Sequence, residues 1–261
     1  MPRKAVIPIL LLAASVAAGE DNRWSIQLRG GWAGVSLEDV KNDRASSAEA
    51  DEWMDIYGGH AVTETVETSG GMLVGWEAAY RTGPMTGLGL RIDYLEPGDI
   101  KSSFHAGGDW GEAASRTEVL STGIVPVMVG WWVGDGKSMR GYLFAGPAFG
   151  SMVSRRNRSF SDPNTGEETD REMATAARGT GVAFEAGGEA VFPLMRGLAV
   201  FVGSNWRRAV LDSMRNTATV DIDGDGTDDV YRGSPVRGSD GSILRFDFSG
   251  WEFSAGLRLD L

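Results

Sequence analysis

The chain has 261 residues, no cysteine and a formal net charge of −11, with 37 glycines and 9 tryptophans. This acidic balance argues against binding to nucleic acid and against an electrostatic attachment to anionic lipid. The absence of cysteine excludes both a disulfide framework and a lipid anchor on an N-terminal thiol.

The first residues have the composition of a secretory signal peptide. Arg3 and Lys4 precede an apolar run over 5–12, and small residues follow as far as Ala18. The run is shorter than the ~20 residues that a spanning helix needs, so a cleaved signal at 1–18 is favoured over a membrane anchor. The remaining chain, 19–261, is long enough for one large all-β domain.

Alternating polarity begins directly after the signal and recurs along the chain. A period of two residues is typical of β-strands, whose successive side chains point to opposite faces. Clear alternation is found at 24–32, 72–81, 88–94, 182–192, 198–207 and 251–261. Two further segments, 118–133 and 141–153, are apolar on both faces, and the pattern does not assign their inward side. Eight strands are therefore predicted.

The connections between these strands alternate between long and short. The long ones lie at 38–69, 96–116, 154–178 and 212–241, and the short ones at 82–86, 134–140 and 193–197. Four long loops on one side and tight turns on the other are typical of an outer-membrane barrel whose termini both lie in the periplasm.

The two faces of the strands favour a barrel in lipid over a soluble lipocalin-like barrel, which is the alternative. Aromatic rings near strand ends suit the two membrane interfaces, and charges on the opposite faces would pair inside the barrel. The aromatic residues are Trp24, Trp32, Tyr80, Tyr94, Trp206 and Trp251. The charged residues are Arg29, Glu77, Arg81, Arg91, Asp93, Glu185, Glu189, Arg207, Glu252 and Arg258. We predict an all-β fold, an eight-stranded antiparallel up-and-down transmembrane β-barrel.

With this plan the chain resembles the small OmpA-type outer-membrane barrels. The signal peptide, the eight strands, the segment GYLFAGPAFG at 141–150 and a final amphipathic strand ending in GLRLDL carry the resemblance. It implies a monomer in the outer membrane, contact with membrane lipid and lipopolysaccharide, and insertion by the barrel-assembly machinery. Family members often end in Phe, whereas this chain ends in Leu261, which weakens the expected assembly signal. No peptidoglycan-binding domain is expected after the barrel.

The sharpest motif lies in the last long loop and indicates a calcium site. Carboxylates at positions one, three and five, followed by Gly226, wrap a short loop around a hard cation. The candidate ligands are Asp221, Asp223, Asp225, the Thr227 carbonyl, and Asp228 or Asp229. The twelfth position holds Arg232 and the flanks are predicted strands, so a complete EF-hand is excluded. An acidic surface loop without a metal is the alternative.

Catalysis has little support in the sequence. His60 and His105 are the only histidines, and both fall in predicted long loops. Ser102 or Ser103 beside His105 is the one local candidate for a Ser–His pair, and we favour a solvated loop histidine. Two histidines without a thiol do not predict a zinc site.

Two other loop features remain. The stretch 43–57 could form a short amphipathic helix that packs over the barrel mouth or meets a partner. Arg155, Arg156 and Arg158 form a basic cluster that could meet lipopolysaccharide phosphates, although loop solvation explains it equally well.

The functional prediction is a non-enzymatic outer-membrane protein with a structural or surface-interaction role, one of its loops braced by Ca²⁺. The alternative is a carrier or narrow channel for small apolar solutes, and a lipid-modifying enzyme is the least supported class. A general porin is disfavoured because eight strands leave an interior just wide enough for side chains. The sequence does not identify the extracellular partner.

Overall fold

The computed structural model describes residues 23–44, 60–66, 68–108, 111–135, 138–161, 168–212, 214–221, 226–238 and 240–261. The predicted signal peptide lies outside them, so its cleavage stays a prediction. Among the described residues, no helix has the length and apolar character needed to cross a membrane.

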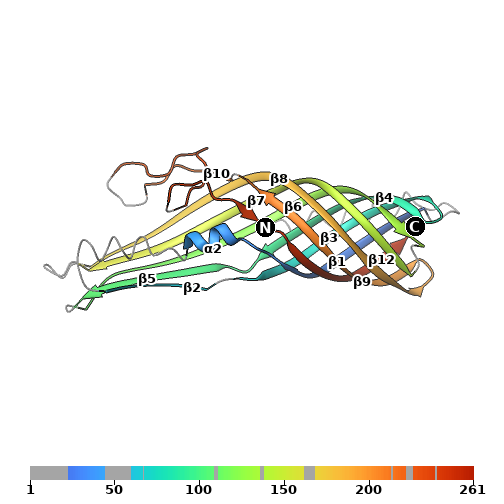
Figure 1. Cartoon of the computed structure of the whole chain (residues 1–261), viewed down its shortest axis with the longest axis horizontal. Coiled ribbons are helices and arrows are strands. Elements are labelled where there is room, and N and C mark those ends of the chain that lie inside the picture. The colour runs from blue at the N-terminus through green and yellow to red at the C-terminus, as the bar shows by residue number, and fades with distance from the viewer. Residues whose placement is uncertain are drawn as a thin grey trace.

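Eight strands form a closed ring (Figure 1). They are β1 (Trp24–Gly34), β3 (Gly70–Gly83), β4 (Thr86–Pro97), β6 (Gly111–Gly134), β7 (Met139–Ser161), β8 (Glu168–Met195), β9 (Leu198–Leu211) and β12 (Gly250–Asp260). Each pairs antiparallel with its neighbour in chain order, and β12 closes the ring against β1. The predicted eight-stranded antiparallel up-and-down barrel is therefore confirmed.

Side chains alternate between the outside and the inside of this ring as the charge pattern predicts. Large apolar residues such as Trp24 and Phe253 are half exposed on the outside, whereas charged residues such as Arg91 and Glu185 are fully buried inside. An apolar exterior around a charged interior is the arrangement of a barrel in lipid. The two segments without an assigned side follow the same rule. Even-numbered residues such as Trp132 face inward and odd-numbered ones such as Trp131 face outward.

Three strands are much longer than a membrane requires. β6, β7 and β8 have 24, 23 and 28 residues, whereas about 9–11 tilted residues cross a bilayer. Beyond the barrel these three strands stay paired with one another, and the distal part of β6 also pairs with β5 (Ile100–Gly108), which in turn pairs with β2 (His60–Val66). We call these five paired segments the outer sheet. Figure 1 shows the outer sheet projecting from the barrel end opposite the C-terminus.

The prediction of loops over much of 96–116 and 154–178 is therefore wrong, because strands occupy most of both ranges. The physical reason is that the outer sheet lies beyond the lipid belt. Its outward face has no need for apolar side chains, and the alternation that marks a membrane strand is lost there.

The remaining long connections fold back over the barrel mouth. One carries helix α2 (Glu38–Arg44), whose first turn holds two acids, a favourable placement at the positive end of the helix dipole. The predicted helix over 43–57 overlaps only the last two residues of α2, and its other residues lie outside the described ones. The other connection, residues 212–249, carries β10 (Met214–Asn216) and β11 (Phe246–Asp247). We call it the distal loop.

Candidate functional site

The centre of the barrel is filled by ion pairs between strands that are far apart in the sequence. Arg91 of β4 donates to Glu77 of β3 at 2.6 Å and 3.1 Å, and to Glu185 of β8 at 3.0 Å. Its guanidinium also lies 4.2 Å from the ring centroids of Tyr142 and Phe144. All three charged side chains are fully buried. Arg91 thereby joins opposite walls of the barrel.

A second group of ion pairs lies beside the first. Arg29 of β1 contacts both Glu252 and Asp93, the latter with 3.4 Å between Arg29 Nε and Asp93 Oδ1. Arg207 of β9 binds Glu252 at 2.9 Å and donates to the Phe248 carbonyl at 3.2 Å and 3.3 Å. Every charge in this group has a partner of opposite sign, which is what burial of charges demands.

A third group lies next to the short turn between β6 and β7. Arg140 binds Glu189 at 2.6 Å and Glu77 at 2.8 Å, and it donates to the Gln27 side-chain oxygen at 2.8 Å. Gln27 in turn donates to Glu189 at 2.8 Å. We call the three groups together the ion-pair layer. It consists of Gln27, Arg29, Glu77, Arg91, Asp93, Arg140, Glu185, Glu189, Arg207 and Glu252.

Asp93, Glu185 and Glu252 of this layer bring carboxylate oxygens within 4.8 Å of one another, the arrangement of a potential cation site. Each of the three already contacts an arginine, namely Arg29, Arg91 or Arg207. Guanidinium groups therefore supply positive charge at the place where a metal would sit.

Above the ion-pair layer, the mouth of the barrel is closed by apolar side chains. Leu37 and Val40 come from the α2 connection, and Phe246 and Phe248 come from the distal loop; all four are fully buried. Residues of the barrel wall surround them within one apolar cluster. These include Leu73, Leu95, Leu120, Ile124, Met152 and Leu211. We call the four loop side chains the mouth plug.

Backbone hydrogen bonds join the two loops of the mouth plug to each other and attach the distal loop to barrel strand β9. Leu37 N donates to Asp247 O at 2.8 Å and Phe248 N donates to Ala209 O at 2.8 Å. Leu37 has a φ of 45°, a left-handed conformation that costs a non-glycine residue on the order of 1 kcal/mol. The surrounding apolar packing outweighs this cost. The conformation of Leu37 turns the chain into the barrel mouth.

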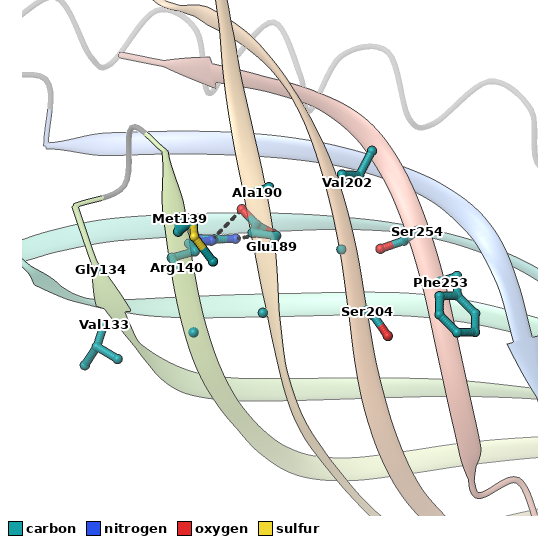
Figure 2. Close-up of a pocket in the computed structure, with 13 residues that line it drawn as sticks. Val133, Gly134, Met139, Arg140, Glu189, Ala190, Val202, Ser204, Phe253 and Ser254 are labelled. Atoms are coloured by element: carbon teal, nitrogen blue, oxygen red, sulfur yellow. Dashed lines mark hydrogen bonds and ion pairs between the residues drawn. The ribbon is translucent and has the colours of Figure 1, made fainter.

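A shallow groove of about 720 Å³ crosses the outer wall near the short turns (Figure 2). Its floor follows a row of cross-strand partners in which Gly141 pairs with Gly188 and Gly188 pairs with Ser204. Val133 and Phe253 flank this row at its two ends, and Figure 2 shows them at opposite sides of the groove. Because the outward belt of the barrel faces lipid, packing of acyl chains is the chemistry that this groove suits.

The residues predicted to bind calcium are only partly described. Asp223 and Asp225 lie outside the described residues. Asp221 accepts a hydrogen bond from Gly226 N at 3.1 Å, and its carboxylate lies 3.7 Å from Arg171. The other predicted ligands, Thr227, Asp228 and Asp229, are exposed. In the same loop, hydrogen bonds from Ser242 lower the pKa of Asp240.

The predicted Ser–His candidates are divided between the two faces of β5. Ser102 is buried on the inner face of the outer sheet, whereas His105 is exposed on the opposite face. Ser103 shares the outward face with His105, two residues along the strand. For His60, only the backbone is described.

The basic cluster at 155–158 is divided between two faces. Arg155 points outward and is exposed, whereas Arg156 and Arg158 point to the inner face of the outer sheet. On that inner face Arg156 binds Glu118 at 3.2 Å. Sequence reasoning missed two arginines that lie on the same inner face, Arg116 and Arg171, because they come from other strands.

Comparisons with known proteins find similar folds only. No family model matches the chain, and no curated protein matches it. Ail of Yersinia pestis shares 9% identity, with 91% of this chain and 99% of Ail covered and a TM-score of 0.37. OprG of Pseudomonas aeruginosa shares 11%, with 91% and 95% covered and a TM-score of 0.34. The outer membrane protease OmpT of Escherichia coli shares 9%, with 94% and 99% covered and a TM-score of 0.40. The strand ring, rather than these overlays, establishes the fold.

Proposed function

We propose that this protein is a non-enzymatic, closed barrel of the bacterial outer membrane that presents the outer sheet and distal loop to the exterior. The observation that carries the proposal is the doubly filled interior. The ion-pair layer occupies the lumen and the mouth plug occupies its opening. A barrel sealed in this way serves as a support, and recognition takes place on what projects from it.

The surroundings of the protein follow from its two surfaces. The apolar belt contacts membrane lipid, and the base of the outer sheet meets lipopolysaccharide. The proposal includes insertion through the barrel-assembly machinery. The closed strand ring, which leaves none of its eight strands unpaired, supports a monomer.

Two measurements on one purified preparation test the proposal. A closed barrel in the outer-membrane fraction should migrate differently on a gel before and after boiling, and it should give no conductance steps in planar bilayers. Stepwise conductance of the unmodified protein would refute the sealed barrel. A soluble periplasmic protein without a mobility shift would refute the membrane location.

A second function has one observation in its favour, the apolar wall behind the mouth plug. If the plug withdraws, the extracellular half of the lumen becomes an apolar chamber suited to a carrier of small apolar solutes. Uptake of a fluorescent fatty acid into vesicles would distinguish this function, because the sealed barrel should add nothing to the rate of empty vesicles.

We also propose that Ca²⁺ braces the distal loop through Asp221, Asp223, Asp225, Thr227 and Asp228 or Asp229. The supporting features are the carboxylate spacing and the hydrogen bond that Gly226 N donates to the Asp221 carboxylate at 3.1 Å.

Calorimetric titration tests this brace. It should give a dissociation constant of ~10⁻⁴–10⁻³ M, typical of extracellular sites. Asp223→Asn should abolish the binding heat, while Asp240→Asn in the same loop should preserve it. No heat at millimolar Ca²⁺ would exclude the brace.

A further inference from the structure

The inner face of the outer sheet carries three arginines in one cross-strand row. Arg116 of β6 pairs in register with Arg158 of β7, and Arg158 pairs with Arg171 of β8. Adjacent strands lie about 4.8 Å apart, so the row spans about 10 Å. Like charges placed directly opposite each other destabilise a sheet. A row of three arginines in a chain of net charge −11 concentrates positive charge on one face and marks it as a candidate anion site.

Neighbouring side chains extend the basic character of this face. Arg156 lies two residues from Arg158 on the same face of β7, with a side chain that is 22% exposed. Arg171 is 34% exposed and reaches the distal loop, where it lies 3.7 Å from the Asp221 carboxylate and donates to the Asp221 carbonyl at 3.4 Å. Phe104 pairs with Arg116 at the other end of the row, and its ring centroid lies 5.9 Å from that guanidinium.

A small cavity of about 130 Å³ lies between this face and the distal loop. Its polar lining consists of Ser154, Thr175, Asn216, two arginines, Arg156 and Arg237, and the Glu118 carboxylate that Arg156 binds; Met152, Met173, Val230 and Val236 complete it. At ~30 Å³ per water, the cavity has room for about four waters or one small polar group. Hydroxyl and amide groups beside guanidinium groups suit a sugar that carries an anion.

We propose that the arginine row and this cavity form a binding site for an oligosaccharide that bears phosphate or sulfate groups. Arginine presents a planar fork of donors that matches such oxyanions in a bidentate geometry. Three guanidinium groups in register would bind successive anionic groups, and the cavity, which Arg156 lines, would receive one hydroxyl or hydroxymethyl group of the sugar. Two sources share this chemistry, the phosphorylated core of lipopolysaccharide in the same membrane and a sulfated or phosphorylated glycan outside the cell. This proposal specifies a ligand class for the recognition surface and thus rests on the proposed function.

Matched pairs of arginines make the site testable. Arg158→Gln with Arg171→Gln removes two charges from the inner row. Arg155→Gln with Arg178→Gln removes two charges from exposed, outward-facing positions of the same two strands, β7 and β8. Both double variants change the net charge equally, so only the location of the lost charge differs.

The assay measures fluorescence anisotropy of a labelled sulfated dextran oligosaccharide bound to the whole protein in phospholipid nanodiscs. We expect the inner pair to weaken binding at least about tenfold, since hydrogen bonds between charged groups are lost, and the outer pair to change it less than about twofold. Unsulfated dextran should not bind, and inorganic tripolyphosphate should compete. Equal weakening by both pairs, or no binding by the unmodified protein, would overturn the proposal.

Further measurements identify the source of the ligand and control for misfolding of the variants. Nanodiscs that contain lipopolysaccharide should suppress probe binding if its phosphates occupy the row, and should leave it unchanged if the row serves a soluble glycan. If the inner double variant loses its heat-dependent gel shift, Arg171→Gln alone replaces it, with Arg178→Gln as its control. If the unmodified protein gives no conductance and binds no probe, only this inference is refuted. A conducting barrel refutes the proposed function, whatever the probe does.

Discussion

Arg91 is the side chain whose loss should reveal most clearly what holds the barrel closed. It is fully buried, binds two carboxylates from different strands, Glu77 and Glu185, and lies against two aromatic rings. Replacing it by methionine retains the apolar stem and removes the charge. Glu77 would keep Arg140 as a partner at 2.8 Å, whereas Glu185 would lose the guanidinium that lies 3.0 Å from it and keep only its cross-strand neighbour Arg207.

The expected loss of stability follows from this difference between Glu77 and Glu185. Breaking a buried pair by removing one partner costs about 3–5 kcal/mol, because the other charge is left uncompensated. Arg91→Met should therefore lower the free energy of unfolding by about that amount. Adding Glu185→Gln to Arg91→Met removes the stranded charge, so the double variant should be more stable than the sum of the single losses predicts. We expect a coupling energy on the order of 1–3 kcal/mol.

Urea unfolding in phospholipid vesicles, followed by tryptophan fluorescence and by the heat-dependent gel shift, measures these losses. Arg245→Gln is the matched control, since Arg245 is 46% exposed and lies 3.8 Å from an exposed Asp212 carboxylate. The control should change the free energy of unfolding by less than about 1 kcal/mol. If Arg91→Met costs no more than Arg245→Gln, or if the Arg91 and Glu185 effects simply add, the ion-pair layer does not hold the barrel as described.

Two further substitutions test the other parts of the interior. Gly75→Ala should destabilise the barrel by about 1–3 kcal/mol, because its methyl group would collide with the Asp93 carboxylate, whereas Gly141→Ala on the outer wall, with its nearest neighbour at 3.7 Å, should be nearly neutral in the same urea assay. Phe248→Ala should cost about 3–5 kcal/mol by leaving a cavity in the mouth plug. It should nevertheless stay silent in planar bilayers because the ion-pair layer remains, and conductance of this single variant would show that the plug alone seals the lumen.

The sequence predicted the membrane part of this fold well because the information there is local. Within one strand, alternation alone separates lipid-facing Trp76 from lumen-facing Glu77. The ion-pair layer shows where such reasoning stops. The charges of Arg91 and Glu185 are visible in the pattern, but their contact across 94 positions depends on barrel closure and register. Arg140 was missed because the sequence places it in a short turn. It is the second residue of β7, and its side chain faces the lumen.

The sequence did not predict the mouth plug or the arginine row, for different reasons. The plug had a usable local signal, since Leu244, Phe246 and Phe248 alternate with polar residues. Such a pattern does not say that the segment folds into the barrel. The arginine row has a local signal only at Arg158, which belongs to the basic cluster; Arg116 and Arg171 come from other strands, and only the register aligns the three.

The charged residues of this protein therefore fall into two groups with different energetic roles. Inside the barrel, each arginine of the ion-pair layer contacts a buried carboxylate, so moving one of them toward a ligand would take positive charge away from buried negative charge. Such groups are poorly placed to exchange partners. On the outer sheet, Arg171 and its Asp221 partner are 34% and 26% exposed, so an incoming anion replaces one wet contact by another at little cost. Recognition of an anionic ligand is thus favoured on the outer sheet and disfavoured in the lumen, although both contain arginine.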